Sequence, residues 1–201
     1  ALRHYADAIE LKPDAFEIRH NYANALVRAD RLPEALAEFA AALRLQPDSA
    51  DANNNFANAL VRAGRNVDAL AHYEAALRSR PDFPEARTNA GITLGHLGRT
   101  DEALAQFAAI PAATAQQSAP LQLHWANLLA RRGELEAALP HFAQAVQLDP
   151  RRPDAHFNHG NALARLERWS EAIREFEAAV ALRPDDAEAR DNLAAARRAG
   201  A

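Results

Sequence analysis

The chain has 201 residues and a formal net charge of −4. Hydrophobic residues make up 49% of it, yet only 6% of all residues are aromatic and about a quarter are alanine. Small apolar side chains fill narrow gaps between close-packed helices rather than one thick core. The charge balance argues against general nucleic-acid binding. The absence of cysteine excludes disulfide scaffolds, thiol catalysis and thiolate metal sites.

Targeting signals are not visible in the sequence. No apolar run approaches the roughly 20 residues of a transmembrane helix, and the N-terminus lacks the features of a signal peptide. We therefore expect no membrane partner and a cytoplasmic location. Because the chain contains no methionine, we expect it to be a processed or excised piece, so the missing signal says nothing about the parent protein.

Proline recurs with a period of 34 residues, in one series at Pro13, Pro47 and Pro81 and in another at Pro150 and Pro184. A 34-residue frame that begins at Phe16 divides the chain, with one inserted residue before the fourth frame. We predict a single array over 1–201. It consists of a partial repeat 1–15, full repeats 16–49, 50–83, 84–118, 119–152 and 153–186, and a terminal helix 187–201.

The first frame predicts two amphipathic helices, roughly over 16–29 and 34–46, with a tight turn at 30–32 between them. Pro33 stands in the first turn of the second helix, where a missing N–H costs little, and Pro47 ends that helix. Three later frames carry glycine at the turn, which is typical of a left-handed residue that ends a helix. These glycines are Gly64, Gly98 and Gly133.

Small and aromatic residues recur at fixed frame positions. Position eight is small in every frame: Ala23, Ala57, Gly91, Ala126, Gly160 and Ala194. Position twenty-four is aromatic in every complete frame: Phe39, Tyr73, Phe107, Phe142 and Phe176. Small residues let neighbouring backbones approach, and the aromatic rings fill the remaining space. A single helix pair cannot bury its apolar face, so we expect the pairs to stack.

The third frame departs from this pattern in its second half. Pro111 falls inside the expected second helix, where it removes a hydrogen-bond donor and clashes with the preceding turn. We therefore predict a loop or short turn over 111–118, which also holds the inserted residue.

The repeated pattern resembles the tetratricopeptide repeat family over the whole chain. The family's tryptophan at position four is absent; this chain has Arg19, Asn53, Arg87, Gln122 and His156 there. The resemblance implies an all-α fold, a right-handed superhelical solenoid of antiparallel helix pairs. It also implies a concave groove, lined by the first helix of each repeat, in which extended peptides lie.

Asparagine fills two columns of positions that, by this resemblance, face the groove. Position six is Asn21, Asn55, Asn89, His124, Asn158 and Asn192; position nine is Asn24, Asn58, Ile92, Asn127, Asn161 and Ala195. Asparagine is a mediocre helix former, so its recurrence within helices needs a role. Its neutral amide matches both the N–H and the C=O of a peptide unit. We interpret the asparagines and His124 as peptide-binding residues.

Two interpretations of the asparagine columns stand side by side. The amides either hold neighbouring helices and loops together or grip the main chain of a bound peptide, and the two roles are compatible. A very similar ladder marks the superhelix of O-GlcNAc transferases, which hold substrate peptides by their backbone. That resemblance favours the second interpretation.

Two charged rows flank the columns. Position two is mostly acidic, with Glu17, Asp51, Glu85 and Asp154. Position thirteen is mostly basic, with Arg28, Arg62, Arg131 and Arg165. We predict that these rows form an acidic and a basic border of the groove. The helix dipole alone would also favour acids in the first turn and bases in the last.

The residues argue against one partner class of this family, the C-terminal tails of chaperones. Repeats that bind such tails hold the terminal carboxylate with lysine, arginine and asparagine side chains. The asparagines of that clamp are matched by Asn24, Asn55, Asn58 and Asn89. Its cations are missing, because His20, Asn54 and Glu85 stand at their positions.

An apolar pocket is predicted between repeats three and five. Its candidate lining residues are Ile92, Gly95, Leu123 and Phe157. Glycine at position twelve would give room for a ligand, and the other three replace polar residues of the groove. The alternative is a packing adjustment around the irregular segment 111–118.

Signatures of metal binding and catalysis are weak. Asp154, His156 and His159 share a helix, but they are few for a metal site and His159 takes a packing position. The sequence shows no phosphate loop, nucleophile elbow or paired acid and base. We expect no metal, no cofactor and no enzyme activity.

Three hypotheses of function follow. The first is a non-catalytic scaffold that binds an extended peptide or partner protein in its asparagine-lined groove. The second is the substrate-recruiting arm of a larger enzyme, such as a glycosyltransferase. The third is self-assembly into a homo-oligomer, because the partial repeat exposes an apolar edge at Leu2, Tyr5 and Ile9.

Overall fold

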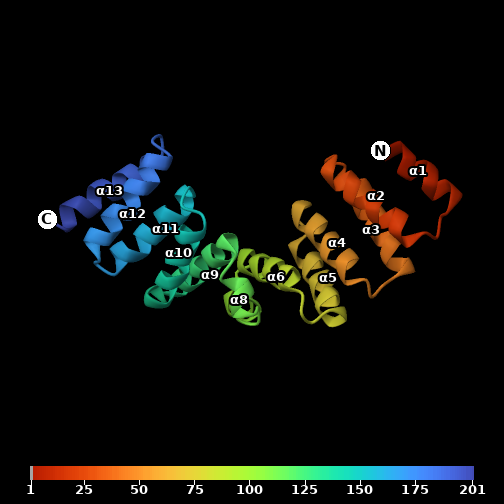
Figure 1. Ribbon diagram of the computed structural model, residues 1–201, viewed down its shortest axis with the longest axis horizontal. Coiled ribbons are helices and arrows are strands. Elements are labelled where there is room, and N and C mark those ends of the chain that lie inside the picture. The colour runs from red at the N-terminus through yellow and green to blue at the C-terminus, as the bar shows by residue number, and fades with distance from the viewer. Residues whose placement is uncertain (1) are drawn as a thin grey trace. The chain divides into compact units, whose positions relative to one another are not determined.

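The computed structural model describes residues 2–201, which form thirteen α-helices and no β-strand (Figure 1). The helices are α1 (Leu2–Leu11), α2 (Phe16–Arg28), α3 (Leu32–Leu45), α4 (Ala50–Arg62), α5 (Asn66–Ser79), α6 (Pro84–His96), α7 (Thr100–Ala108), α8 (Ala112–Ala115), α9 (Ala119–Arg132), α10 (Leu135–Leu148), α11 (Pro153–Arg165), α12 (Trp169–Leu182) and α13 (Ala187–Ala199). The prediction of an all-α fold is confirmed. None of the helices in this range has the length and apolar character to cross a bilayer.

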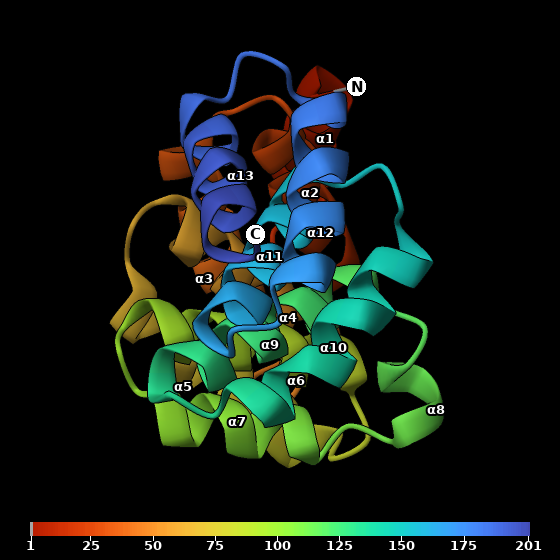
Figure 2. The same ribbon diagram turned by 90° about the vertical axis from the view of Figure 1, so that its left-hand side faces the viewer.

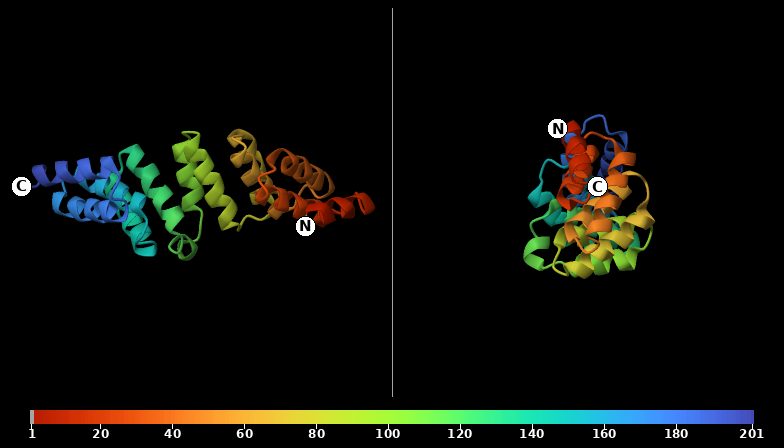
Figure 3. Two further views of the ribbon diagram at one scale, coloured as in Figure 1. Left: turned by 90° about the horizontal axis from the view of Figure 1, so that it is seen from above. Right: turned by 90° about the vertical axis from the view of Figure 1, so that its right-hand side faces the viewer.

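The chain divides into two compact units, Ala1–Ala109 and Ile110–Ala201. In the first unit, α2, α4 and α6 each pack against the helix that follows and the helix that precedes in the sequence (Figure 3). In the second unit, α11 packs between α10 and α12, and α13 packs against α12 (Figure 2). Each unit is therefore built of stacked helix pairs, as a helical solenoid requires.

The predicted turn between paired helices is right in kind but lies one residue too late, because α2 ends at Arg28 and α3 begins at Leu32. The second helix of the first repeat, α3, begins at Leu32, two residues before the predicted start. Pro33 in its first turn needs no N–H donor, so the helix can begin one residue before it. The turn residue is left-handed throughout, with φ of 58° at Asp30, 76° at Gly64 and Gly98, and 89° at Gly133.

The aromatic residues at position twenty-four fill the space that the small residues at position eight leave. All five rings in the complete repeats are at most 1% exposed. The fit is tightest at the glycines: a Cβ on Gly91 would lie 2.4 Å from Cε1 of Phe107, and one on Gly160 would lie 2.7 Å from Cε1 of Phe176. These two glycines are therefore needed for close approach rather than for backbone freedom.

The irregular segment predicted around Pro111 is present. Helix α7 ends at Ala108, and Pro111 precedes the short helix α8, which spans only four residues. Helix α9 then begins at Ala119, where Oγ of Ser118 accepts a hydrogen bond from the backbone N–H of Leu121. Pro111 thus interrupts the second helix of the third repeat, as its missing N–H predicts.

Position four carries a side chain that bonds in two directions. In the second repeat, Asn53 Nδ2 donates to the carbonyl oxygen of Pro47, in the preceding loop, over 2.8 Å. Asn53 Oδ1 lies 2.9 Å from Nδ1 of His72, at position twenty-three of the same repeat. We call this arrangement a linker bridge. Its side-chain pairs are Arg19–Glu38, Asn53–His72, Arg87–Gln106, Gln122–His141 and His156–Glu175.

The linker bridges share one geometry but not one chemistry. The carbonyls that they reach belong to Pro13, Pro47, Pro81 and Pro150 in loops and to Ala115 at the end of α8. The first and fifth bridges pair a basic side chain with a carboxylate, whereas the second and fourth pair an amide with an imidazole. Each bridge ties the first helix of a repeat both to the segment before it, a loop or the end of α8, and to its own second helix.

Candidate functional site

The asparagine columns of the first unit lie on α2, α4 and α6, and their amides bond from one repeat to the next. Asn89 Nδ2, at position six on α6, donates to Asn58 Oδ1, at position nine on α4, over 3.0 Å. The same oxygen accepts from the hydroxyl of Tyr73 over 2.6 Å. Both lone pairs of the Asn58 carbonyl are therefore engaged within the protein.

The second unit repeats the bond between positions six and nine. Asn158 Nδ2 on α11 donates to Asn127 Oδ1 on α9 over 3.0 Å, and Asn192 Nδ2 on α13 donates to Asn161 Oδ1 on α11 over 2.9 Å. We call each such pair an amide step; the three steps are Asn89–Asn58, Asn158–Asn127 and Asn192–Asn161. All six residues are half-buried. The amide steps therefore connect neighbouring helices, which is the first of the two roles predicted for the columns.

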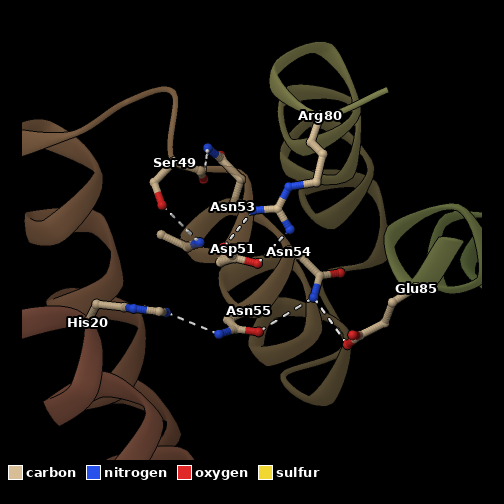
Figure 4. Close-up of polar contacts among 9 residues, drawn as sticks. His20, Ser49, Asp51, Asn53, Asn54, Asn55, Arg80 and Glu85 are labelled. Carbon is tan, nitrogen blue, oxygen red and sulfur yellow. Dashed lines mark hydrogen bonds and ion pairs between the residues drawn. The ribbon is translucent and has the colours of Figure 1, made fainter. Parts of the chain in front are cut away.

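Between α2 and α4, a histidine takes the place of an amide step. Nε2 of His20 lies 3.0 Å from Nδ2 of Asn55 (Figure 4) and 3.1 Å from Nδ2 of Asn24. A ring nitrogen that accepts from amide N–H groups carries no proton. Burial lowers the pKa of His20, and the nearby charge of Asp51 opposes this shift. Asn21 is exposed on α2, and no hydrogen bond joins its side chain to another residue in the range 2–201.

The basic row caps the ends of neighbouring helices. Arg62 on α4 donates from Nη1 to the carbonyl oxygen of Val27 near the end of α2, over 3.1 Å. Arg165 on α11 reaches the carbonyl oxygen of Ala130 on α9 in the same way, also over 3.1 Å. These contacts bring a positive charge to the negative end of a helix dipole in the preceding repeat. Arg28 and Arg131 lie exposed at the equivalent positions of their own helices.

Members of the acidic row also have partners within the protein. Asp51 accepts two hydrogen bonds from Arg80, over 3.0 Å and 2.7 Å, and these bonds lower the pKa of its carboxyl (Figure 4). Glu85 Oε1 lies 3.3 Å from Nδ2 of Asn54. Asp154 pairs with Arg152, whereas Glu17 lies exposed on α2. The helix dipole and local pairing favour these charges, and their role as borders of a groove stays a prediction.

The residues of the predicted apolar pocket are spread over two units. Ile92 and Gly95 lie on α6 in the first unit. In the second unit, Leu123 is only 3% exposed, and the ring of Phe157 lies 6.0 Å from that of Phe176, between centroids. Both side chains pack in the core of that unit, and the apolar pocket stays a prediction. His124, at position six on α9, is half-buried.

Two histidines of α11 face one carboxylate of α12. Nδ1 of His156 lies 2.7 Å from Oε2 of Glu175, and Nδ1 of His159 lies 3.4 Å from Oε1. Burial raises the pKa of Glu175, but the two histidines together outweigh burial, and the net shift is downward. Across residues 2–201, no three histidine, aspartate or glutamate side chains are arranged to hold a metal ion.

Comparison with known proteins identifies the family to which the repeat is similar. A family model described as tetratricopeptide repeat matches residues 1–50, 54–118, 123–187 and 157–200. No curated protein sequence matches the chain significantly.

Solved structures share the fold over most of the chain. YrrB, described as a TPR protein with an unusual peptide-binding site, is 26% identical, with a TM-score of 0.81 over 95% of this chain and 98% of that chain. MamA from Desulfovibrio magneticus RS-1 is 21% identical, with a TM-score of 0.77 over 86% of this chain and 97% of that chain. PilF of Pseudomonas aeruginosa is 16% identical, with a TM-score of 0.76 over 90% and 88%. The last two likenesses show the fold alone.

Proposed function

The chain belongs to the tetratricopeptide repeat family, and from this premise we propose that it is a non-catalytic scaffold that binds an extended peptide or partner protein along its asparagine columns. The likeness to YrrB, which is described as having a peptide-binding site, supports a peptide ligand. The amides themselves supply the chemistry of the proposal.

The observation that carries the proposal is the set of polar groups that the amide steps leave over. An amide step uses one N–H of the position-six asparagine and one lone pair of the position-nine asparagine. The position-six amide keeps its oxygen and a second N–H, and the position-nine amide keeps both N–H groups. An extended peptide presents alternating N–H and C=O groups that fit this set, whatever its side chains are.

The amide steps also allow a test that separates ligand binding from folding. In Asn127→Asp and Asn161→Asp, the remaining Oδ1 still accepts the bond from the next repeat, but both N–H donors are lost. We expect the free energy of unfolding to stay within about 0.5 kcal/mol of the parent value. Each lost bond to the ligand should weaken binding by about 1 kcal/mol, or roughly fivefold. Isothermal titration with a peptide selected from a random-sequence array measures this.

A matched control carries the same charge change away from the columns. Asn66→Asp, at the start of α5, adds one negative charge and should leave peptide affinity unchanged. A second control alters the ligand: N-methylation of its backbone should weaken binding, whereas alanine substitution of most of its side chains should not. Equal affinity of the parent, N127D and N161D for both forms of the peptide would remove the groove proposal.

A role as the recruiting arm of a larger enzyme is the second candidate. It rests on the resemblance of the asparagine columns to the ladder of O-GlcNAc transferases. The full sequence of the parent protein tests it: an α/β nucleotide-sugar domain in the same polypeptide supports it, and a polypeptide without a catalytic domain contradicts it.

Self-assembly is the third candidate, and an apolar surface at α1 favours it. A cavity of about 390 Å³ is lined by His4, Tyr5, Ala8 and Ile18, and Leu11 is 84% exposed. Burial of such a surface between copies would be favourable. We expect the mass from light scattering to rise with protein concentration, and Ile18→Glu to abolish the rise. A constant monomer mass would exclude this candidate.

A further inference from the structure

In the first unit, an arginine on α4 donates to two acceptors at the end of α2, the first helix of the preceding repeat. Arg62 on α4 donates to the carbonyl oxygen of Val27 and to Oδ1 of Asp30, both over 3.1 Å. Asp30 is left-handed, with φ of 58°, and its own N–H donates to the same Val27 oxygen over 3.2 Å. The carbonyl and the carboxylate together form an acceptor pair for one guanidinium group.

The end of α11, in the second unit, builds the same turn. Glu167 has φ of 58°, and its N–H donates to the carbonyl oxygen of Ala164 over 3.0 Å. The next N–H, that of Arg168, donates to Leu163 O over 3.0 Å, as its equivalent does after Asp30. Ala164 O and the Glu167 carboxylate are thus the counterparts of Val27 O and the Asp30 carboxylate. Within residues 2–201, neither receives a hydrogen bond from a side chain.

Helix α13 has alanine where α4 has Arg62. Ala199 stands at position thirteen of α13, and Ala195 stands at position nine in place of asparagine. These two alanines line a cavity of about 550 Å³ together with Ala164, Trp169 and Phe176. Because Ala199 has no long side chain, nothing from position thirteen of α13 reaches the end of α11 as Arg62 reaches the end of α2. Trp169 also lines a neighbouring cavity, which contains Glu167.

We infer that this cavity receives the arginine side chain of a bound partner. Its guanidinium donates to Ala164 O and pairs with the Glu167 carboxylate, as Arg62 does with Val27 O and Asp30. The aliphatic stem lies against the alanines of α13, and the indole of Trp169 adds a favourable cation–π contact. This inference rests on the proposed function, which supplies the main chain that carries the arginine, and it names the side chain that such a ligand needs.

Arginine fits the acceptor pair better than lysine does. A guanidinium presents several N–H donors in a planar fork and reaches a carbonyl and a carboxylate at once, whereas an ammonium is a compact point charge. The acceptor pair also keeps a negative charge for the ligand. The neighbouring Arg168 and Arg197 already pair with Glu171 and Glu177. Glu167 forms no ion pair with any residue in the range 2–201.

One positive charge also lines the cavity. Arg165 lies at position thirteen of α11, and its Nη1 donates to the carbonyl oxygen of Ala130. Arg165 precedes the cavity by one repeat, just as Arg28 precedes Arg62 by one repeat at position thirteen. The fold therefore already accommodates two guanidinium groups in successive repeats of this row.

The test uses three capped pentapeptides. Each has a central residue flanked by glycines, and that residue is arginine, lysine or citrulline. Citrulline keeps the shape of arginine but carries no charge. In ¹⁵N-resolved NMR titrations, the arginine peptide should shift the indole N–H of Trp169, and the indole N–H of Trp125 on α9 is the internal control. We expect affinity for the citrulline peptide to be about tenfold lower, since it loses a charge-assisted hydrogen bond, and the lysine peptide to fall between.

Two variants complete the test. Glu167→Gln should reduce affinity for the arginine peptide to that for the citrulline peptide, whereas Asp30→Asn, at the equivalent turn of the first unit, should leave it unchanged. Ala199→Arg supplies the guanidinium from within and should abolish binding of the arginine peptide. Equal binding of all three peptides, or an unchanged affinity in both E167Q and A199R, would overturn the inference.

The two proposals fail independently. The pentapeptides are too short to need the asparagine columns, and Asn127 does not line the cavity, so N127D should bind the arginine peptide as the parent does. If the columns bind no peptide while the pentapeptide result holds, the groove proposal alone is lost. If arginine-free peptides bind the columns and the pentapeptides fail, the arginine site alone is lost.

Discussion

The two units carry the same asparagine columns but engage them differently. In the first unit, the Asn58 oxygen accepts two bonds, and His20 binds the amides of both Asn24 and Asn55. In the second unit, each amide step is a single bond between two asparagines. The repeat position therefore fixes where an amide lies, while the neighbouring residue types decide how much of its hydrogen-bonding capacity stays open to a ligand. The second unit keeps more of it.

The largest expected effect compares the two glycines at position eight. Gly91→Ala and Gly160→Ala each place a Cβ against a buried ring, so we expect each to lower the free energy of unfolding by about 1–3 kcal/mol. Gly91→Ala should cost more, because its Cβ would lie 2.4 Å rather than 2.7 Å from the ring. Urea denaturation measures both. The additional change Phe176→Leu should relieve part of the strain in G160A; no relief would contradict the packing argument.

The next prediction compares position nine in the two units. Asn58→Ala removes the acceptor of both Asn89 and Tyr73, whose ring is only 1% exposed, so we expect a loss of about 2 kcal/mol. Asn127→Ala removes one half-buried bond and should cost about 1 kcal/mol. Thermal and urea unfolding measure the difference. With Tyr73→Phe as background, the cost of N58A should fall toward that of N127A; equal costs in the parent background would contradict the difference between the units.

The pH dependence should be shared by the two units. Burial lowers the pKa of His72 in the first unit and of His141 in the second. As the pH falls below about 6.5, these histidines therefore take up protons in the unfolded chain before they do so in the folded chain. We expect the free energy of unfolding to fall from that pH downward, until the folded-state values are passed. His72→Gln and His141→Gln should each flatten the profile below pH 6.5, and unchanged profiles in both variants would contradict this.

The smallest effect is expected when the chemistry of one linker bridge is exchanged for that of another. The double variant Asn53→Arg, His72→Glu places the Arg19–Glu38 pair of the first repeat in the second repeat. Since both pairs use one geometry, we expect the free energy of unfolding to change by less than about 1 kcal/mol. His72→Glu alone leaves an amide oxygen facing a carboxylate and should cost more than the double variant. A double variant less stable than H72E would show that the bridges are not interchangeable.

The fold could be predicted from the sequence because its signals are periodic. The 34-residue spacing, the small residues at position eight and the rings at position twenty-four all describe the same packing. The break at Pro111 followed from one missing N–H. The early start of α3 at Leu32 was missed, because a proline in the first turn permits the helix to begin on either side of it.

The partners of the candidate site could be predicted only in part. The columns were visible as a pattern, but the bond between position six of one repeat and position nine of the one before depends on how neighbouring helices pack. The linker bridges were missed because position four carries four different residue types. A search for complementary donors and acceptors at positions four and twenty-three would have found them, from Arg19–Glu38 to His156–Glu175.

The linker bridges determine which residues unfold together when part of such an array opens locally. Since Asn53 holds the Pro47 carbonyl as well as the His72 ring, opening of the α4–α5 pair also releases the loop that precedes it. The cooperative unit in native-state hydrogen exchange should therefore include that loop and run ahead of the 34-residue frame by several residues. A proteolytic nick in the loop would then loosen the pair that follows it more than the pair that precedes it.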